Sequence, residues 1–233
     1  PGSNIDRMVN SYCLIHKETK AASMAVFDLD DMTEIMTKHF QASSRGAVGG
    51  VARDRSSNTD RSRDPLYNQL KMYSEVYRML GWLRPMSKRL EFSTTILGDL
   101  IAEEFVDRQD LVYGLVRQCL LAVTFPNPLT NNVSVTSHRP FRWLLLLMLS
   151  LEGVITRAEM ILGLLAVIND RDGSVFSETV ELIVDLRGGS RERLDEKVSE
   201  YADYVDLQVN TLGNYTRLPV GVLKSPQLRW ATS

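Results

Sequence analysis

Residues 66–102, LYNQLKMYSEVYRMLGWLRPMSKRLEFSTTILGDLIA, decide the fold of this chain. Up to Leu80 the apolar side chains recur at helical spacing, and Gly81 is a typical stop signal for a helix. Two short extended runs joined by a basic turn then lie within residues 82–93. This pattern predicts a β-hairpin, and the apolar run after Thr95 predicts a further helix packed behind it.

A second helix is predicted upstream of this stretch. The acidic residues 28–31 (DLDD) form a start signal, and apolar residues follow at helical spacing, namely Met32, Ile35, Met36 and Phe40. The order helix, turn, helix, hairpin, helix is typical of winged-helix proteins. Residues 1–25 are expected to form an N-terminal arm that begins with a tag remnant, Pro1-Gly2-Ser3.

Another helical unit is predicted after the turn-rich residues 125–132. Pro140 is tolerated in the first turn of a helix, and residues 141–151 are apolar on nearly all sides, which predicts a central buried helix. Residues 156–159 (TRAE) have the spacing of a capping box and should open the next helix, which we expect to run through Ile168.

The remaining segments complete the predicted organisation. Ser174 is expected to cap a helix that ends at Gly188-Gly189, and residues 191–205 are expected to form a charged, exposed helix. We therefore expect a mainly α-helical protein with short β-hairpins, built from two or three winged-helix or helix-turn-helix subdomains. The expected boundaries are an arm at 1–25, a first subdomain at 26–124, a second at 125–206, and a linker or the start of a further small unit at 207–233.

The composition indicates a soluble, cytoplasmic protein. Hydrophobic residues make up 44% of the chain and charged residues 24%, which is ordinary for a globular domain. The longest apolar stretch, residues 143–151, is too short to cross a bilayer. Cys13 and Cys119 show no metal-binding spacing and indicate a reducing compartment. The histidines are isolated from one another and from cysteine, so no metal site or catalytic triad is predicted at His16, His39 or His138.

Charge is unevenly distributed along the chain. The formal net charge is −2, yet residues 45–93 hold 10 Lys and Arg against 5 Asp and Glu, whereas residues 94–233 hold 13 against 18. A local basic excess of this kind is what phosphate binding requires, although it also describes many solvated surfaces.

The basic loop before residue 65 supplies the first candidates for DNA contact. Arginine presents a planar fork that bridges two acceptors of guanine or clamps a phosphate. The candidates in this loop are Arg45, Arg53, Arg55, Arg61 and Arg63, with Ser43, Ser44 and Asn58 as additional hydrogen-bonding residues. The alternative interpretation is a disordered linker in which the serines and the asparagine cap turns.

Further candidates lie outside this loop. Lys88 and Arg89 occupy the hairpin tip, where a winged helix contacts the DNA backbone or minor groove. Arg139 and Arg217 are candidates in the second unit, although pairing with the surrounding acidic residues is the favoured interpretation there. Aromatic residues that recur at helical spacing are interpreted as core and interface residues and not as base-stacking surfaces, namely Tyr67, Tyr73, Tyr77 and Trp82.

Six short sequence segments occur in a particular order over residues 26–230. They are residues 80–83 (LGWL), 92–98 (FSTTILG), 125–128 (FPNP), 139–149 (RPFRWLLLLML), 155–160 (ITRAEM) and 214–223 (NYTRLPVGVL). This combination resembles the DNA-recognition region of FokI-type and AlwI-type restriction endonucleases. The resemblance implies winged-helix subdomains that read an asymmetric duplex site, with a separate Mg²⁺-dependent nuclease domain that cuts nearby.

The chain departs from that pattern at the nuclease motif. A metal-dependent nuclease needs paired carboxylates and a lysine on adjacent strands, and neither residues 16–20 (HKETK) nor residues 195–197 (DEK) provide this arrangement. We therefore expect a monomeric recognition fragment that binds double-stranded DNA, has no cofactor of its own and is not an enzyme. A winged-helix transcriptional regulator and a protein-interaction scaffold are the alternatives.

Overall fold

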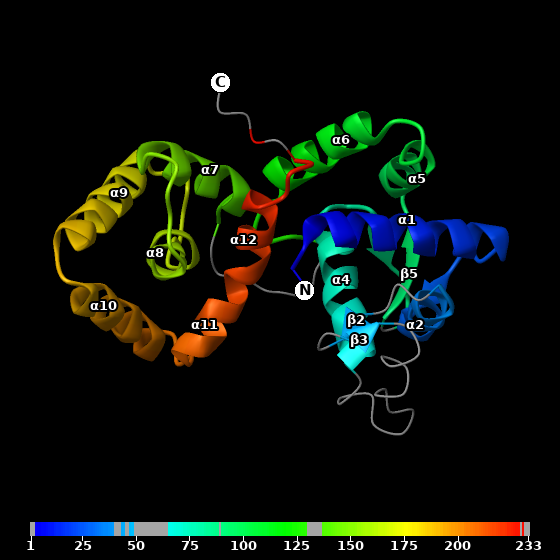
Figure 1. The fold of residues 1–233 in the computed structure, drawn as a ribbon, viewed down its shortest axis with the longest axis horizontal. Coiled ribbons are helices and arrows are strands. Elements are labelled where there is room, and N and C mark those ends of the chain that lie inside the picture. The colour runs from blue at the N-terminus through cyan, green and yellow to red at the C-terminus, as the bar shows by residue number, and fades with distance from the viewer. Residues whose placement is uncertain are drawn as a thin grey trace. The chain divides into compact units, whose positions relative to one another are not determined.

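The computed structural model describes residues 3–39, 65–88, 90–129, 137–228 and 230, and the backbone of two short strands at 43–44 and 47–48. These parts are mainly helical, with a small three-stranded antiparallel sheet (Figure 1). The mainly helical fold class is therefore confirmed. The chain divides into two compact units, which we name unit 1 (Pro1–Cys119 with Ser225–Ser233) and unit 2 (Leu120–Lys224).

Unit 1 begins with a helix where the sequence was expected to form an arm. Helix α1 (Ile5–Ala21) starts at Asn4, whose side chain accepts a hydrogen bond from the backbone of Arg7 at 2.8 Å. Its buried face carries apolar residues at helical spacing, namely Ile5, Met8, Val9, Tyr12 and Ile15. The prediction for residues 1–25 is therefore wrong as regards residues 5–21, because this apolar face packs into the core of unit 1 and contacts helices α2 and α5.

The elements that follow in unit 1 are β1 (Phe27–Asp28), α2 (Leu29–Lys38), β2 (Ser43–Ser44), β3 (Ala47–Val48), α4 (Pro65–Met79), β4 (Leu83–Pro85), β5 (Glu91–Thr94), α5 (Ile96–Glu104) and α6 (Gln109–Ala122), of which the last residues belong to unit 2. Helix α2 opens with a capping box between Asp28 and Asp31, as the acidic start signal predicts. The predicted β-hairpin is confirmed in β4 and β5, which pair antiparallel with Leu83 opposite Thr94.

Strand β1 completes the sheet, whose order is β1-β5-β4. Phe27 lies opposite Phe92, so a residue that precedes α2 pairs with the hairpin across 65 positions of sequence. The buried side chain of Arg78, near the end of α4, pairs with Glu75 and lies over the Phe92 ring at 5.8 Å from its centroid. Helix α4 is thereby fixed against the hairpin.

Unit 2 contains α7 (Pro140–Ser150), α8 (Arg157–Met160), a π-helical turn η2 (Ile161–Leu165), α9 (Gly173–Gly188), α10 (Arg191–Tyr204), α11 (Val209–Tyr215) and α12 (Arg217–Leu223). One core cluster joins α7, α8, η2 and α9, and its buried members include Leu147, Leu164 and Ile183. The indole N–H of Trp143 donates to the carbonyl of Gly163 at 2.7 Å, which ties α7 to the π-helical turn.

Local start signals in unit 2 were predicted well. Pro140 occupies the first turn of α7, and Thr156 and Glu159 form the predicted capping box. Two details differ. The helix after the box changes to a π-helical turn and ends at Leu165, short of Ile168, and α9 is capped by Asp172, whose carboxylate accepts the Ser174 N–H at 3.0 Å.

The C-terminal region forms no unit of its own. Helices α11 and α12 belong to unit 2, and the residues after Lys224 belong to unit 1. There the Ser225 hydroxyl donates to the Asp6 carboxylate at 2.5 Å, and Arg117 donates to the carbonyl of the fully buried Leu228 at 3.1 Å. Among the described helices, none combines the length and the apolar character needed to cross a membrane.

Candidate nucleic-acid interface

Helix α4 presents two faces of different chemistry. Its inner face is apolar, and the aromatic residues Tyr73 and Tyr77 are buried there beside Trp82, as the sequence predicted. The outer face exposes Asn68, Lys71 and Met72. Asn68 and Lys71 are three residues apart, so their side chains project from the same side of the helix. Lys71 is exposed and forms no ion pair with another described residue.

The β4–β5 hairpin, which follows α4 in the sequence, carries an exposed lysine. Lys88 lies at the hairpin tip with 81% of its side chain exposed, and its ammonium group is 3.2 Å from the Glu91 carboxylate. Arg84 on β4 donates from Nε to the Ser93 hydroxyl at 2.6 Å, which stiffens the base of the hairpin. Arg89 lies outside the described residues.

The basic loop was the first candidate for DNA contact, and most of it lies outside the described residues. Strand β2 contains Ser43 and Ser44 and pairs antiparallel with β3. The candidates that lie outside the part described are Arg45, Arg53, Arg55, Asn58, Arg61 and Arg63. Their predicted role stays a prediction.

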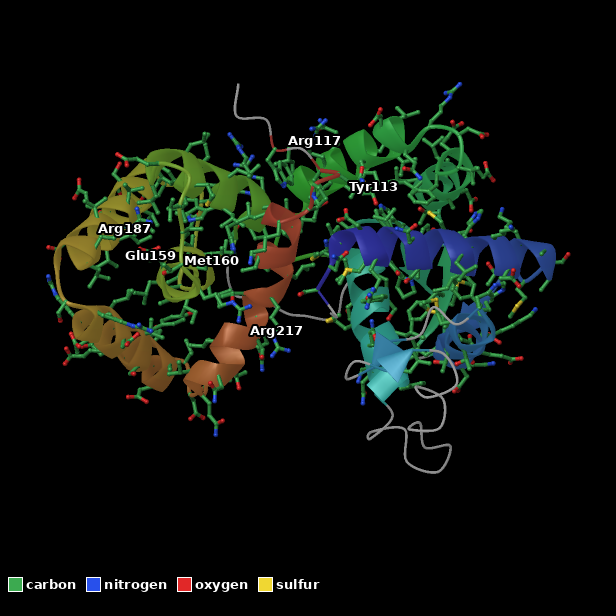
Figure 2. All side chains as sticks on the ribbon, viewed as in Figure 1. Tyr113, Arg117, Glu159, Met160, Arg187 and Arg217 are labelled. Atoms are coloured by element: carbon green, nitrogen blue, oxygen red, sulfur yellow. The ribbon has the colours of Figure 1, made fainter. Side chains whose placement is uncertain are left out.

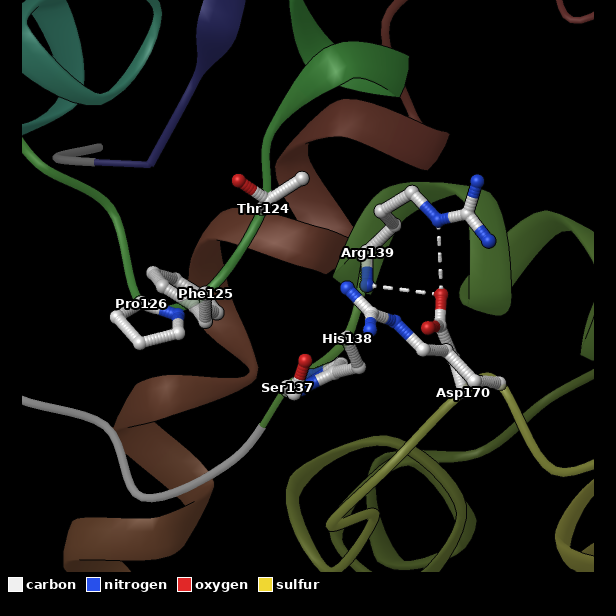
Figure 3. Close-up of a pocket in the computed structure, with 8 residues that line it drawn as sticks. Thr124, Phe125, Pro126, Ser137, His138, Arg139 and Asp170 are labelled. Atoms are coloured by element: carbon white, nitrogen blue, oxygen red, sulfur yellow. Dashed lines mark hydrogen bonds and ion pairs between the residues drawn. The ribbon is translucent and has the colours of Figure 1, made fainter.

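Arg139 pairs with an acidic residue of unit 2. It precedes α7, and its Nε and backbone N–H both donate to the Asp170 carboxylate, at 3.0 and 3.1 Å (Figure 3). The Asp170 side chain is only 7% exposed. Burial disfavours its ionised form, but the hydrogen bonds and charge of Arg139 outweigh this effect and lower the Asp170 pKa. The ion pair fixes the Arg139 side chain at one point through Nε.

Arg139 also lines a pocket of about 430 Å³. Two further basic or titratable side chains, Arg171 and His138, share its wall. Backbone hydrogen bonds join its walls, from Phe125 N–H to the His138 carbonyl at 2.9 Å and from Asp170 N–H to the Ser137 carbonyl at 3.3 Å. The complete lining is Thr124, Phe125, Pro126, Ser137, His138, Arg139, Asp170 and Arg171 (Figure 3).

Arg217 lies in a different part of unit 2, at the start of α12 (Figure 2). It lines a depression of about 550 Å³ together with Arg157, Asn210 and Asn214, over an apolar floor that includes Ile161 and Val198. Neither arginine forms an ion pair with another described residue. Asp195 lies on the same rim and offsets part of their charge.

Helix α9 carries charge of the opposite sign. Its exposed residues include Glu178, Glu181 and Asp185. Its basic residue Arg187 turns toward α8, where Nε donates to the buried Glu159 carboxylate at 2.7 Å (Figure 2). The outer surface of α9 therefore repels phosphate groups.

The two segments weighed as nuclease motifs are both helical. Residues 16–20 lie in α1, where His16 pairs with Asp99 at 2.9 Å and Glu18 is 3.1 Å from His39. Residues 195–197 lie in α10. No group of three or more His, Cys, Asp or Glu suited to a metal ion occurs among the described residues.

Burial raises the pKa of the Cys13 thiol to about 12, so this thiol is protonated at neutral pH.

Sequence reasoning missed Lys71, Asn68 and Arg171 as candidate ligand-binding residues. Lys71 and Asn68 were passed over because the apolar face of the same helix dominated the pattern; the polar positions between the apolar ones were the available signal. Arg171 stands in a turn-rich run of residues 169–173 (NDRDG), where only the tertiary contacts bring it to His138 and Arg139. Comparison of this chain with protein-family models, with curated proteins and with solved structures found no match.

Proposed function

We propose that unit 1 is a winged-helix module that binds double-stranded DNA with α4 as its recognition helix. The observation that carries the proposal is the order α1, β1, α2, α4, β4, β5, with the separate β2-β3 pair inserted between α2 and α4, combined with the sheet order β1-β5-β4. In a winged helix the strand after the first helix pairs with the second strand of the hairpin, and the helix before the hairpin enters the major groove.

The outer face of α4 supports this assignment. An asparagine amide matches the donor and acceptor of adenine in the major groove, and a lysine contacts guanine or a phosphate. Asn68 and Lys71 supply these two groups from adjacent turns of one helix. Met72, which is exposed one turn after Asn68 and next to Lys71 in the sequence, offers an apolar contact of the kind that a thymine methyl group accepts.

The hairpin supports the same orientation. The tip of a wing contacts the DNA backbone beside the recognition helix, and the exposed Lys88 occupies this position. Its ion pair with Glu91 is at the surface and therefore weak, at under about 1 kcal/mol, so a phosphate can replace the carboxylate at little cost.

The negative charge of α9 favours unit 1 over unit 2 as the unit that recognises the DNA duplex. Unit 2 also has a succession of helices, α7, α8 and α9, that a second recognition motif would need. Its third helix exposes acidic residues, however, and a like charge facing phosphates opposes binding. We therefore place recognition of the duplex on α4 and the hairpin.

The resemblance to restriction endonucleases extends this proposal to the parent protein. In that interpretation the chain supplies recognition, and hydrolysis of DNA resides in a nuclease domain that uses Mg²⁺. Incubation of the chain with a selected duplex and Mg²⁺ tests this part, because accumulation of cut DNA in proportion to the protein would contradict it.

Selection from a pool of random duplexes at low and at moderate salt tests the DNA-binding proposal. A short asymmetric motif that persists at moderate salt supports it. A palindromic motif would favour a dimeric transcriptional regulator instead, and the absence of enrichment at both salt concentrations would rule out sequence recognition.

Replacement of Lys71 tests the role of α4. Lys71→Ala should weaken binding to the selected duplex by roughly tenfold and lower the salt slope of the binding constant by about 1, because one phosphate or base contact is lost. Fluorescence anisotropy over a series of salt concentrations measures both quantities. Lys17→Ala is the matched control, since it removes an exposed lysine of the same unit from α1. Equal effects of the two substitutions would contradict the assignment of α4.

A further inference from the structure

We propose that the pocket beside α7, lined by His138, Arg139 and Arg171, binds a phosphate group. The inference concerns unit 2 and does not depend on DNA binding by α4. The chemistry is that of a phosphate oxygen anion, which a phosphate monoester such as a nucleotide and the diester backbone of a nucleic acid both supply.

The charges in the pocket favour an anion. Two guanidinium groups, of Arg139 and Arg171, share the wall with one carboxylate, that of Asp170. Asp170 is already hydrogen-bonded to Arg139 through Nε and the backbone N–H, so the two terminal nitrogens of that guanidinium are not used by this pair. Arg171 forms no ion pair with any residue that the structure describes. Paired guanidinium groups are the arrangement that recognises phosphate with several parallel hydrogen bonds.

His138 contributes an unsatisfied group to the same wall. His138 is only 8% exposed, and its Nδ1 has no hydrogen-bond partner among the described residues. A buried ring nitrogen without a partner is destabilising, and such groups often mark the place of a ligand or an ion. The hydroxyl groups of Thr124 and Ser137 lie on the same lining and add potential donors.

Helix α7 adds to the positive potential. It is 11 residues long, begins directly after Arg139 and has no side-chain cap at its N-terminus. The uncapped N–H groups of a first helical turn and the helix dipole both favour an anion. The volume of about 430 Å³ falls within the range of small-molecule sites, so the pocket has room for more than a bare phosphate ion.

Binding of a phosphate should change the protonation of His138. The charged groups that line the pocket together with this ring are Asp170, Arg139 and Arg171. Burial lowers the His138 pKa and the charge of Asp170 partly opposes this, so the ring is neutral at pH 7. An anion beside the ring stabilises the protonated form, and a bound phosphate should therefore raise the His138 pKa.

The experiment titrates the whole chain with three probes: inorganic phosphate, adenosine 5′-monophosphate and a short duplex with unphosphorylated ends. Calorimetry gives the affinity, and NMR of the histidine ring gives the His138 pKa with and without each probe. Arg171→Ala should weaken binding at least tenfold, since a charge-assisted contact is lost from an exposed side chain whose removal leaves the core intact. Arg191→Ala on α10 is the matched control, because that side chain is 90% exposed and does not line the pocket.

If inorganic phosphate and adenosine 5′-monophosphate bind, and Arg171→Ala weakens their binding, the pocket is a site for a phosphate monoester. If Arg171→Ala weakens only the binding of the duplex, the pocket contacts the phosphate backbone of a nucleic acid. If the duplex binds only through α4, Lys71→Ala should abolish duplex binding and Arg171→Ala should leave it unchanged. Failure of the phosphate-site proposal is therefore distinguishable from failure of the proposed DNA-binding function. The inference is overturned if no probe binds saturably, if Arg171→Ala and Arg191→Ala behave alike, or if the His138 pKa stays unchanged at saturation.

Discussion

At the start of α5, Gly98 lies against two groups that leave no space for a side chain. A β-carbon at this position would overlap the Tyr12 hydroxyl and the Trp82 carbonyl oxygen. These two atoms are themselves hydrogen-bonded at 3.2 Å, and the Gly98 N–H donates to the Thr95 hydroxyl that caps the helix. The glycine thus permits close contact between α1, the hairpin and α5.

Gly98→Ala should lower the free energy of unfolding by about 1–3 kcal/mol, because the added methyl group must displace backbone and a buried tyrosine. Gly114→Ala is the control, since Gly114 lies in α6 with open space around its α-carbon, and alanine there should add up to about 1 kcal/mol through its higher helix propensity. Urea unfolding of the two variants measures both effects. Equal stability would contradict the close contact at residue 98.

At the scale of the elements, Arg187 joins α9 to the start of α8. It hydrogen-bonds the buried Glu159 carboxylate at 2.7 Å and the Val154 carbonyl at 2.5 Å. Arg193 and Asp185 form a pair of similar length, 2.8 Å, with both side chains half exposed. The Arg187 pair is the more buried of the two, and Arg187 also donates to the Leu151 and Val154 carbonyls, so the comparison measures burial together with these additional bonds.

Arg187→Ala should destabilise the protein by about 3 kcal/mol, because it leaves the Glu159 carboxylate buried without its partner. Arg193→Ala should cost under about 1 kcal/mol, since water screens the exposed pair. Urea unfolding at neutral pH provides the comparison. Similar losses in the two variants would show that burial of Glu159 does not govern the strength of its pair.

The same pair predicts a dependence on pH. Burial disfavours ionisation of Glu159, but Arg187 and the Thr156 N–H outweigh it and lower the Glu159 pKa. A carboxyl whose pKa is lower in the folded state stabilises the protein above its unfolded pKa, about 4.3, and this contribution is lost as the pH falls through the folded value. The stability difference between the wild type and Arg187→Ala should therefore be full at pH 7 and shrink below about pH 4. A difference independent of pH would contradict this assignment.

Local signals account for most of what was predicted at this scale. The capping boxes at Asp28 and Thr156, the first-turn Pro140 and the β4–β5 hairpin each depend on residues a few positions apart. The cap of α9 was misplaced at Ser174 because aspartate and serine both suit that position and only the backbone conformation distinguishes Asp172 as the residue outside the helix.

At the scale of the whole molecule, the chain leaves unit 1, forms unit 2 and returns to unit 1 after Lys224. The returning segment buries Leu228 completely, and its backbone accepts a hydrogen bond from Arg117 of α6. The first and the last described segments are joined as well, through Asp6 and Ser225. Unit 1 therefore depends on residues at both ends of the sequence.

Leu228→Ala should destabilise unit 1 by about 2–5 kcal/mol, because truncation of a fully buried leucine leaves a cavity. Hydrogen exchange of the α1 and α6 amides measures the loss within unit 1. Gln227→Ala, at the neighbouring exposed residue, is the control and should leave exchange unchanged. Unchanged protection in Leu228→Ala would contradict a structural role for the returning segment.

The sequence by itself determined the mainly helical class, the helix ends with strong caps, the hairpin and the basic character of residues 45–93, because periodicity, capping and turn preferences act over a few residues. Only the tertiary structure decided that residues 5–21 form a core helix, that β1 pairs with β5, and that Arg139 is held by Asp170 beside His138 and Arg171. Arg139 and Asp170 are 31 positions apart in the sequence, and Phe27 and its β5 partner Phe92 are 65 positions apart. Which distant segments meet depends on how the apolar faces pack together, and that packing belongs to the folded chain as a whole.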